Sequence, residues 1–390
     1  MTDSIDWYFD PLPGPAFSAA LRDLRTAGPV VATTALGGAL PIHYIVGYDA
    51  LAEAFRAGDR FPPAHAYQII SEPYIGQTFM SMEETPHGVW RPPMMKRFRR
   101  RAIDALGDDE VAALATELLD ALPAAGEIDL VPTFTHRFAF AVICRQLGLP
   151  REREDAFYGW SMDLMFGGRD LERSRRADAA LTEYVMPVVE ARRREPRDDA
   201  ISDWLATDVE GEPIGDASIL SHIRLVFTAG ATTTSDALGN LLHALGTHPA
   251  AWEAVAAEPE RAEDAVQELL RWNPPVAAQP RFVRPDADAE LAGTRIPANS
   301  AVLFGIHAAH RDPAEFPEPD HFDLERRPKE LLTFGPGLRT CPGMHLAQKN
   351  LRIGLRELAR RLPGFRLTHP EADAPRGILL RGPAALRARW

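Results

Sequence analysis

The sequence predicts a mainly α-helical fold with a smaller β-rich portion, an α+β architecture. Two stretches, about 86–273 and 344–361, carry apolar residues at every third or fourth position, the spacing of an amphipathic helix. Short apolar runs broken by proline and glycine, typical of strands and turns, form β-rich portions at about 28–80, 276–330 and 364–390. No repeat, low-complexity segment or clear linker interrupts the chain, so we expect one domain.

This domain is expected to span 1–390, and its first eighty residues mix both textures. A helix is predicted over 15–27. The run ALPIHYIVGY (39–48) predicts a strand because it is rich in β-branched and aromatic residues. The aromatic stretch 62–80 is expected to form an irregular loop.

The helical portion contains one long element, because apolar residues continue at helical spacing from 216 to 247. At about 1.5 Å per residue, such a helix crosses the whole molecule. After Arg271, frequent prolines divide the chain into short strands and turns. There the segment 294–312, TRIPANSAVLFGIHAAHRD, predicts two strands around a turn.

Composition and charge narrow the function. The 43 basic and 55 acidic residues give a net charge of -12, which disfavours nucleic acid as the main partner. The N-terminus lacks the basic start and apolar run of a secretion signal, and no stretch reaches the ~18 apolar residues of a membrane span. Only two cysteines, Cys144 and Cys341, argue against a disulfide framework. We expect a cytoplasmic protein without a membrane partner, in which Cys144 packs in the core.

Cys341 lies in a loop of glycine and proline, FGPGLRTCPG (334–343). A thiolate is a soft ligand for a transition metal, and a metal already held by a macrocycle such as haem needs only one protein sulfur. Glycines let the backbone approach a flat ring, and the backbone N–H groups of Gly343 and Met344 can hydrogen-bond the sulfur. A helix beginning near Pro342 would add its positive end beneath the thiolate. The alternative is a structural cysteine buried in a tight turn.

The pattern Phe-Gly-x-Gly-x-Arg-x-Cys-x-Gly resembles the haem-binding loop of the cytochrome P-450 superfamily. The resemblance covers nearly the whole chain. It implies haem b (iron protoporphyrin IX) between the long central helix and the cysteine loop, with Cys341 as the metal ligand. It also implies residues beside the ring and basic residues at the two propionates. These are Phe334, Gly335, Gly343, Ala229 and Gly230 beside the ring, and His87, Arg91, Arg281 and Arg339 at the propionates.

A second motif, Glu268-x-x-Arg271, puts two opposite charges on one helix face, where they can pair. The family has such a pair some 70 residues before its cysteine, joined by a later arginine, for which Arg326 is the candidate. The resemblance implies that this network fixes the core behind the haem. The family often has Asn-Arg-Asp before this segment, whereas this chain has His310 at the first of those positions.

The stretch AGATTTSD on the long helix resembles the family's Ala/Gly-Gly-x-acid-Thr motif. Thr233 falls on the usual threonine, and Thr232 replaces the acid that normally relays protons for O–O cleavage. We expect both to be catalytic, with the relay completed by water, Thr234 or a substrate hydroxyl. The alternative is that these hydroxyls only bond back to the preceding turn. The resemblance implies a substrate pocket lined by the aromatic loop 62–80 and by small or apolar residues, namely Thr228, Val276, Ala277 and Leu379.

The basic run KRFRRR follows the region of His87. In the family this surface lies on the cysteine side of the haem, where it would steer an acidic electron donor by charge. The alternative is a solvated helix face. No flavin or nicotinamide fingerprint occurs, so electrons from NAD(P)H are expected to arrive through a separate ferredoxin and ferredoxin reductase. The candidate docking residues are Lys96, Arg97, Arg99, Arg100 and Arg101.

These features predict a haem-thiolate monooxygenase that inserts one atom of dioxygen into a C–H bond or an alkene of an apolar small molecule. A peroxide-dependent haem enzyme is one alternative, suggested by the missing acid. Peroxide-dependent relatives, however, tend to have an arginine in place of the threonine motif, and Thr233 is present. A non-catalytic haem-binding sensor or recruitment module is the alternative from another class.

Overall fold

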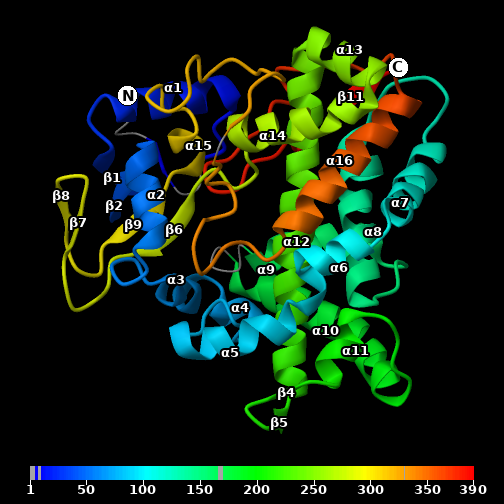
Figure 1. The fold of residues 1–390 in the computed structure, drawn as a ribbon, viewed down its shortest axis with the longest axis horizontal. Coiled ribbons are helices and arrows are strands. Elements are labelled where there is room, and N and C mark those ends of the chain that lie inside the picture. Colours follow the sequence, from blue (N-terminus) through cyan, green and yellow to red (C-terminus); the bar gives the residue numbers. More distant parts are fainter. Residues whose placement is uncertain (1–4, 8–9, 166–169, 329) are drawn as a thin grey trace.

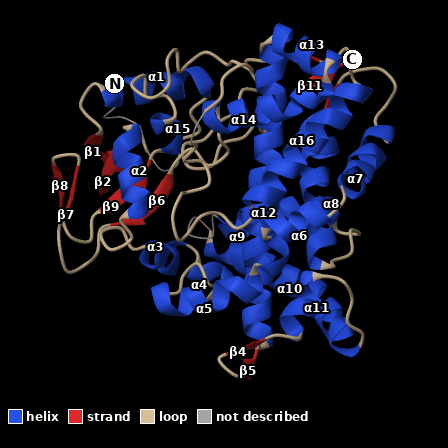
Figure 2. Cartoon of the chain, viewed as in Figure 1, coloured by secondary structure: helices blue, strands red, loops and turns tan. Residues whose placement is uncertain are grey.

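The computed structural model describes residues 5–7, 10–165, 170–328 and 330–390. Helices dominate one side of the molecule and strands gather on the other (Figures 1 and 2). The helices are α1 (Gly14–Arg25), α2 (Tyr48–Arg56), α3 (Pro63–Ile70), α4 (Glu72–Ile75), α5 (Glu84–Met94), α6 (Arg100–Ala105), α7 (Asp108–Asp120), α8 (His136–Leu147), α9 (Glu154–Met165), α10 (Leu171–Arg194), α11 (Ala200–Leu205), α12 (Asp216–Thr247), α13 (Pro249–Ala257), α14 (Ala262–Trp272), α15 (Ile306–Ala309) and α16 (Met344–Arg361). The strands are β1 (Val30–Ala35), β2 (Leu40–Ile45), β3 (Ile128–Asp129), β4 (Asp208–Val209), β5 (Glu212–Pro213), β6 (Gln279–Phe282), β7 (Ala289–Leu291), β8 (Thr294–Ile296), β9 (Ala301–Phe304), β10 (Arg366–Leu367) and β11 (Arg387–Arg389).

A four-stranded sheet of order β1-β2-β9-β6 forms most of the β-rich portion. β1 and β2 are an antiparallel hairpin, whereas β2 and β9 run parallel, with Ile42 opposite Ala301. β6 is the edge strand and pairs antiparallel with β9, which sets Gln279 opposite Phe304. This edge lies toward the helical portion (Figure 1) and brings residues of β6 to the cavity between the two portions.

The mainly helical α+β fold class is confirmed, and three helices end close to their expected bounds. α12 and α16 span the expected 216–247 and 344–361, and α1 differs from 15–27 by one or two residues. The expected strands within 294–312 are present as β8 and β9, but they do not pair with each other. β8 forms a hairpin with β7, while β9 inserts between β2 and β6.

The β-rich portion expected at 28–80 was too long. Strands end at Ile45, and α2, α3 and α4 occupy most of the following thirty residues, including the stretch expected to be an irregular loop. α2 forms around buried apolar side chains, namely Tyr48, Leu51 and its three alanines. α3 begins at Pro63, where a proline is tolerated because the first helical N–H groups lack partners in any helix.

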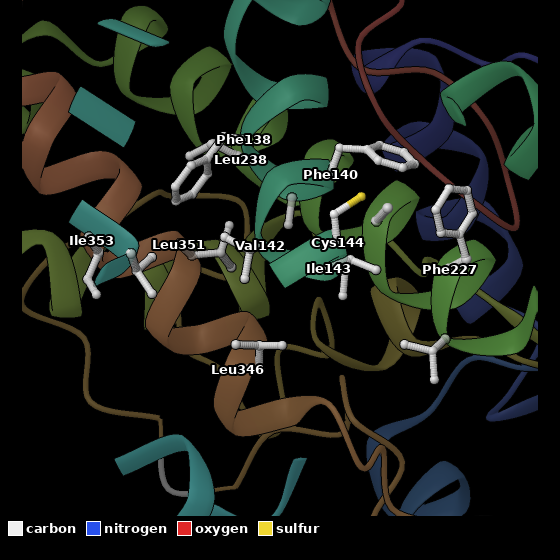
Figure 3. Packing of buried hydrophobic residues seen from close by; sticks show 14 of the residues in the cluster. Phe138, Phe140, Val142, Ile143, Cys144, Phe227, Leu238, Leu346, Leu351 and Ile353 are labelled. Carbon is white, nitrogen blue, oxygen red and sulfur yellow. The ribbon is translucent and has the colours of Figure 1, made fainter. Parts of the chain in front are cut away.

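α12 passes through the middle of the helical portion and packs against α8, α9, α14 and α16 (Figure 1). Figure 3 shows side chains of α8 between α12 and α16, including Phe140, which lies 4.7 Å from Phe227 between ring centroids. Cys144 lies beside them and is 1% exposed, so its expected place in the core is confirmed. The position of α12 is thus fixed by the helices packed around it, and one side of it forms a wall of the cavity described below.

Among the residues that the structure describes, no helix is both long enough and apolar enough to span a lipid bilayer.

Candidate active site

A cavity of about 840 Å³ lies between α12 and the loop that carries Cys341. α3, α5, β6 and the first turns of α16 supply its other walls. Most of the wall is apolar, as in small-molecule sites in general. The polar side chains that face it include Arg56, Glu83 and Glu84, four further basic residues, and a few hydroxyl or amide groups. The four basic residues and the hydroxyl and amide groups are described in turn.

Cys341 is exposed to this cavity and enclosed by protein on its other sides. The backbone N–H groups of Gly343 and Met344 hydrogen-bond its sulfur, which confirms the two donors expected from the sequence. Burial raises the pKa of the Cys341 thiol, while these two donors and the Arg91 guanidinium oppose the rise. A metal cation at the sulfur would remove the cost of ionisation, because coordination deprotonates a thiol.

The conformation of the loop explains two of its glycines. Gly335 and Gly337 have φ angles of +64° and +111°, a region that residues with a Cβ rarely adopt. The Cys341 N–H donates to the Phe334 carbonyl at 2.8 Å and closes the loop beneath the sulfur. α16 begins at Met344, so its N-terminal end lies next to the thiol, as expected.

The basic side chains of His87, Arg91, Arg281 and Arg339 all line the cavity. Two of them also fasten its walls. Arg91 of α5 donates to the carbonyls of Leu338 and Thr340 in the cysteine loop. Arg339 donates to the carbonyls of three residues before α5, namely Phe79, Met80 and Met82.

His87 has an unsatisfied ring atom. Among the described residues, its buried Nε2 has no hydrogen-bond partner. Burial, reinforced by the charges of Arg339 and Arg91, lowers the pKa of His87 to about 4. A buried polar atom without a partner is costly, so a ligand that accepts a hydrogen bond here would be stabilising. The site therefore fits a haem: one sulfur, cationic groups for two carboxylates, and an apolar wall.

Ala229, Gly230 and Thr233 of α12 face the cavity, as does Thr234. Thr233 donates from Oγ1 to the Ala229 carbonyl at 2.6 Å, the bond within the helix that was the alternative interpretation. At position 230 the packing of α8 also favours glycine, because a Cβ there would lie 2.8 Å from Ile143 Cδ1. Thr234 was expected only as a possible part of the proton relay, and it lines the cavity together with Gly230, four residues before it on the same helix face.

The roles expected for Thr228 in the substrate pocket and for Thr232 in catalysis require correction, because neither residue lies on the cavity wall. Thr232 is 0% exposed, and its Oγ1 donates to the Thr228 carbonyl at 2.5 Å. The two residues are four apart and therefore share a face of α12, which is buried in the protein. Thr232 thus occupies the usual position of the acid in the motif without reaching the cavity.

The expected substrate pocket also requires correction. Val276 lines the cavity, but Ala277 and Leu379 do not. The Ala277 N–H donates to the Leu379 carbonyl at 2.8 Å, and both side chains are buried in the core beside α1. Tyr67 and Gln279 face the cavity instead, and sequence reasoning missed them as individual residues. The only signal for Tyr67 was the aromatic character of 62–80.

Glu268 and Arg271 of α14 form a fully buried pair, as expected from their spacing. Arg271 donates from Nε and Nη2 to the two carboxylate oxygens, at 2.8 and 2.6 Å. Arg326 joins from one side, with its Nε 3.4 Å from Glu268 Oε1. Arg271 also donates to the carbonyls of Pro319 and His321, so the pair anchors the chain that leads to the cysteine loop.

The departure at His310 has a structural use. Its Nε2 accepts the N–H of Leu332 at 2.8 Å, just before the cysteine loop begins. The His310 carbonyl accepts from Arg271 at 3.1 Å. The histidine therefore connects the α14 network with the loop that holds Cys341.

The basic run lies on the surface where α5 ends and α6 begins. Lys96, Arg99, Arg100 and Arg101 are exposed. Two of them form long ion pairs, Lys96 with Asp203 at 3.8 Å and Arg100 with Asp104 at 3.6 Å. Arg97 forms shorter ones, with Asp203 at 2.9 Å and with Asp198 at 2.8 Å. Its side chain is 23% exposed.

Comparisons with known proteins agree with this site. The family model "Cytochrome P450" matches residues 153–382. The chain is 32% identical to mycinamicin IV hydroxylase/epoxidase of Micromonospora griseorubida, over 80% of this chain and 79% of that protein. It is 29% identical to 6-deoxyerythronolide B hydroxylase of Saccharopolyspora erythraea, over 97% of this chain and 94% of that protein.

Solved structures agree as well. Cytochrome P450 CYP109Q5 from Chondromyces apiculatus matches with a TM-score of 0.87 at 28% identity, over 100% of this chain and 98% of that one. The family carries haem, and its curated relatives are monooxygenases, which accounts for a lone cysteine in a glycine-rich loop beside a deep cavity. The chain therefore belongs to the cytochrome P450 family and is a haem-containing monooxygenase.

Proposed function

We propose that this monooxygenase hydroxylates or epoxidises an apolar small molecule of medium size in secondary metabolism. The observation that carries this proposal is the cavity of about 840 Å³, largely apolar, with Cys341 at one wall and Thr233 at another. Relatives named for the hydroxylation of mycinamicin IV and 6-deoxyerythronolide B support the proposal.

In this proposal the haem, bound through Cys341, supplies the activation of dioxygen. The N–H groups of Gly343 and Met344 share the negative charge of the thiolate and fix its orientation. The residues at the propionates are those proposed from the sequence: Arg91, Arg281 and Arg339 as cations, and His87 as a neutral hydrogen-bonding group, since burial lowers its pKa to about 4. The apolar wall orients the substrate and excludes water from the reacting centre.

Thr233 is the proposed proton-handling residue. Its hydroxyl proton is directed at the Ala229 carbonyl, so its oxygen can accept a hydrogen bond from a water or a substrate hydroxyl in the cavity. Because Thr232 is buried away from the cavity, it supplies no proton directly. Thr234, which also lines the cavity, is the nearest further hydroxyl on the helix for such a water.

We further propose a cytoplasmic setting, with electrons delivered by a ferredoxin and its NAD(P)H-dependent reductase. The exposed basic residues between α5 and α6 support the ferredoxin partner, because they stand out on a chain that is acidic as a whole, with a net charge of -12. A basic patch on an acidic protein favours an acidic partner by charge complementarity.

The ligand assignment is tested by a reduced carbon-monoxide difference spectrum of wild type, Cys341→Ser and Cys144→Ala. We expect the thiolate-type Soret band in wild type and in Cys144→Ala, whose sulfur is buried in the core. Cys341→Ser should lose the band. A Cys341→Ser protein that kept the thiolate-type band would refute the assignment. Product formed from an apolar substrate with NADPH, ferredoxin and reductase then tests the reaction.

A further inference from the structure

The cavity wall holds a polar pair whose two side chains come from different elements. Tyr67 lies on α3 and Gln279 on β6, and both face the cavity. Gln279 Nε2 donates to Tyr67 Oη at 2.7 Å. Both side chains are partly buried. The pair therefore links α3 with β6 in the cavity wall, beside Arg281.

The pair is held in place before any ligand binds. The Arg281 guanidinium lies 5.2 Å from the centre of the Tyr67 ring, close enough for a cation–π contact. Arg281 is itself fixed by a bond from its Nη1 to the Pro280 carbonyl at 2.8 Å. A polar group that is already oriented loses little entropy when it binds a ligand.

The pair also retains hydrogen-bonding capacity. Tyr67 Oη accepts from Gln279, which leaves the phenolic proton to donate. Gln279 uses Nε2, which leaves its Oε1 to accept. Within the described part of the chain, neither group has a second hydrogen-bond partner.

We propose that Tyr67 and Gln279 anchor an oxygen of the substrate, so that the substrate is an apolar skeleton with a hydroxyl or carbonyl group. The Tyr67 hydroxyl donates to a carbonyl or hydroxyl oxygen, and Gln279 Oε1 accepts from a hydroxyl. This inference rests on the proposed function and adds the substrate class. A site that hydrogen-bonds an oxygen discriminates against analogues without one, because its own polar groups are then left unpaired.

A haem carboxylate could use the same chemistry. Arg339 lies near enough to Tyr67 for their charges to interact, and Arg339 is one of the proposed propionate contacts. The two sources differ in consequence. If the hydroxyl serves the haem, its loss weakens retention of the cofactor and affects all substrates equally. If it serves the substrate, only oxygenated ligands are affected.

The test uses the holoenzyme and ligands that bind through an imidazole nitrogen, 4-phenylimidazole and its ortho-, meta- and para-hydroxyphenyl analogues. Spectral titration gives the Kd of each in wild type, Tyr67→Phe and Gln279→Met. Tyr184→Phe is the matched control, because it removes a hydroxyl that donates to the Pro150 carbonyl. Transfer of haem to apomyoglobin is measured in parallel. Turnover is not needed, so failure of the proposed reaction would be seen separately.

We expect at least one hydroxyl analogue to bind wild type and Tyr184→Phe about fivefold more tightly than 4-phenylimidazole, the gain of one net hydrogen bond. That gain should disappear in Tyr67→Phe or Gln279→Met, while haem transfer keeps its wild-type rate. Three results would overturn the proposal: no gain in wild type, the same gain in both variants, or faster haem loss with equal weakening of every ligand.

Discussion

A rotation of about 100° along α12 separates the side chains of Thr232 and Thr233, and it decides which of them can act. Thr233 faces the cavity, whereas Thr232 is 0% exposed and bonds within the helix. From the motif alone, both threonines are expected to reach the reacting centre. In three dimensions only one hydroxyl can meet a substrate or a water in the cavity.

Replacing each threonine with valine keeps its shape and removes its hydroxyl. We expect Thr233→Val to lower the yield of product per NADPH by about tenfold or more, because Thr233 would position the water that passes protons, and a side chain positioned for proton transfer typically contributes 10²-fold or more to a rate. Thr232→Val should retain wild-type coupling. Product and hydrogen peroxide are quantified against NADPH consumed. Loss of coupling in Thr232→Val, with Thr233→Val unaffected, would reverse the assignment.

Another residue of α12, Asp236, is buried, and no cation among the described residues forms an ion pair with it. It is 8% exposed, and burial raises its pKa to about 7 from 3.8. Gly382 lies so close that a Cβ on it would be 2.4 Å from Asp236 Oδ1. Between pH 4 and 7 the folded protein keeps this proton while the unfolded chain has lost it. Stability should therefore fall as the pH rises through this window and then level off.

Asp236→Asn removes the titration while keeping the size of the side chain. We expect the free energy of unfolding of the variant to exceed that of wild type by an amount that grows from pH 5 to 7.5 and reaches up to about a few kcal/mol. The melting temperature of the variant should rise above that of wild type over the same range. Asp104→Asn is the control, because Asp104 is 67% exposed. Melting curves of the holoenzyme across pH provide the measurement. A constant difference between variant and wild type would show that Asp236 stays ionised.

At the scale of elements, α14 holds the cysteine loop through buried polar contacts. Arg271 bonds Glu268 and three carbonyls of the segment 310–321. Thr333, at the start of the loop, donates to the Leu270 carbonyl at 2.6 Å. A buried ion pair contributes little net stability, but removing one partner leaves a charge that nothing neutralises.

The two arginines at Glu268 should therefore differ in their effects. Arg271→Ala should lower the free energy of unfolding by about 3–5 kcal/mol, so that little holoprotein is recovered. Arg326→Ala should cost less, about 1–2 kcal/mol, because its contact with Glu268 is long and its other hydrogen bonds go to the Pro317 and Glu318 carbonyls. Haem content and melting temperature are measured for both. Equal losses would contradict a network centred on Arg271.

Sequence reasoning succeeded where structure is local. α12 and α16 follow from helical spacing alone, and the donors to Cys341 lie within three residues of it. It failed where position depends on distant partners. Ala277 leaves the cavity wall because its backbone pairs with Leu379, a hundred residues away. α3 and α4 were missed because each has a proline in its first turn, which resembles a turn signal although it suits the start of a helix.

Over the whole molecule, charge is distributed unevenly. The chain is acidic, yet the surface between α5 and α6 presents four exposed basic residues close to the cysteine loop. Arg91 bonds the Leu338 carbonyl at 2.7 Å, which places this loop against the end of α5. Leu338 is 77% exposed, the largest value among the large hydrophobic residues described as exposed. An electron donor docked here would approach Cys341 from the side away from the substrate.

Reversing one charge on this surface should therefore weaken binding of the electron donor and leave the substrate pocket unchanged. We expect Arg101→Glu to raise the KM for an acidic ferredoxin several-fold at low salt, with the difference shrinking as ionic strength rises past about 0.1 M. Arg295→Glu changes the net charge equally, but Arg295 lies on β8, far from α6 in Figure 1. Its KM should stay near the wild-type value. Equal increases in both variants would mean that only net charge matters, and no increase in either would place the docking surface elsewhere.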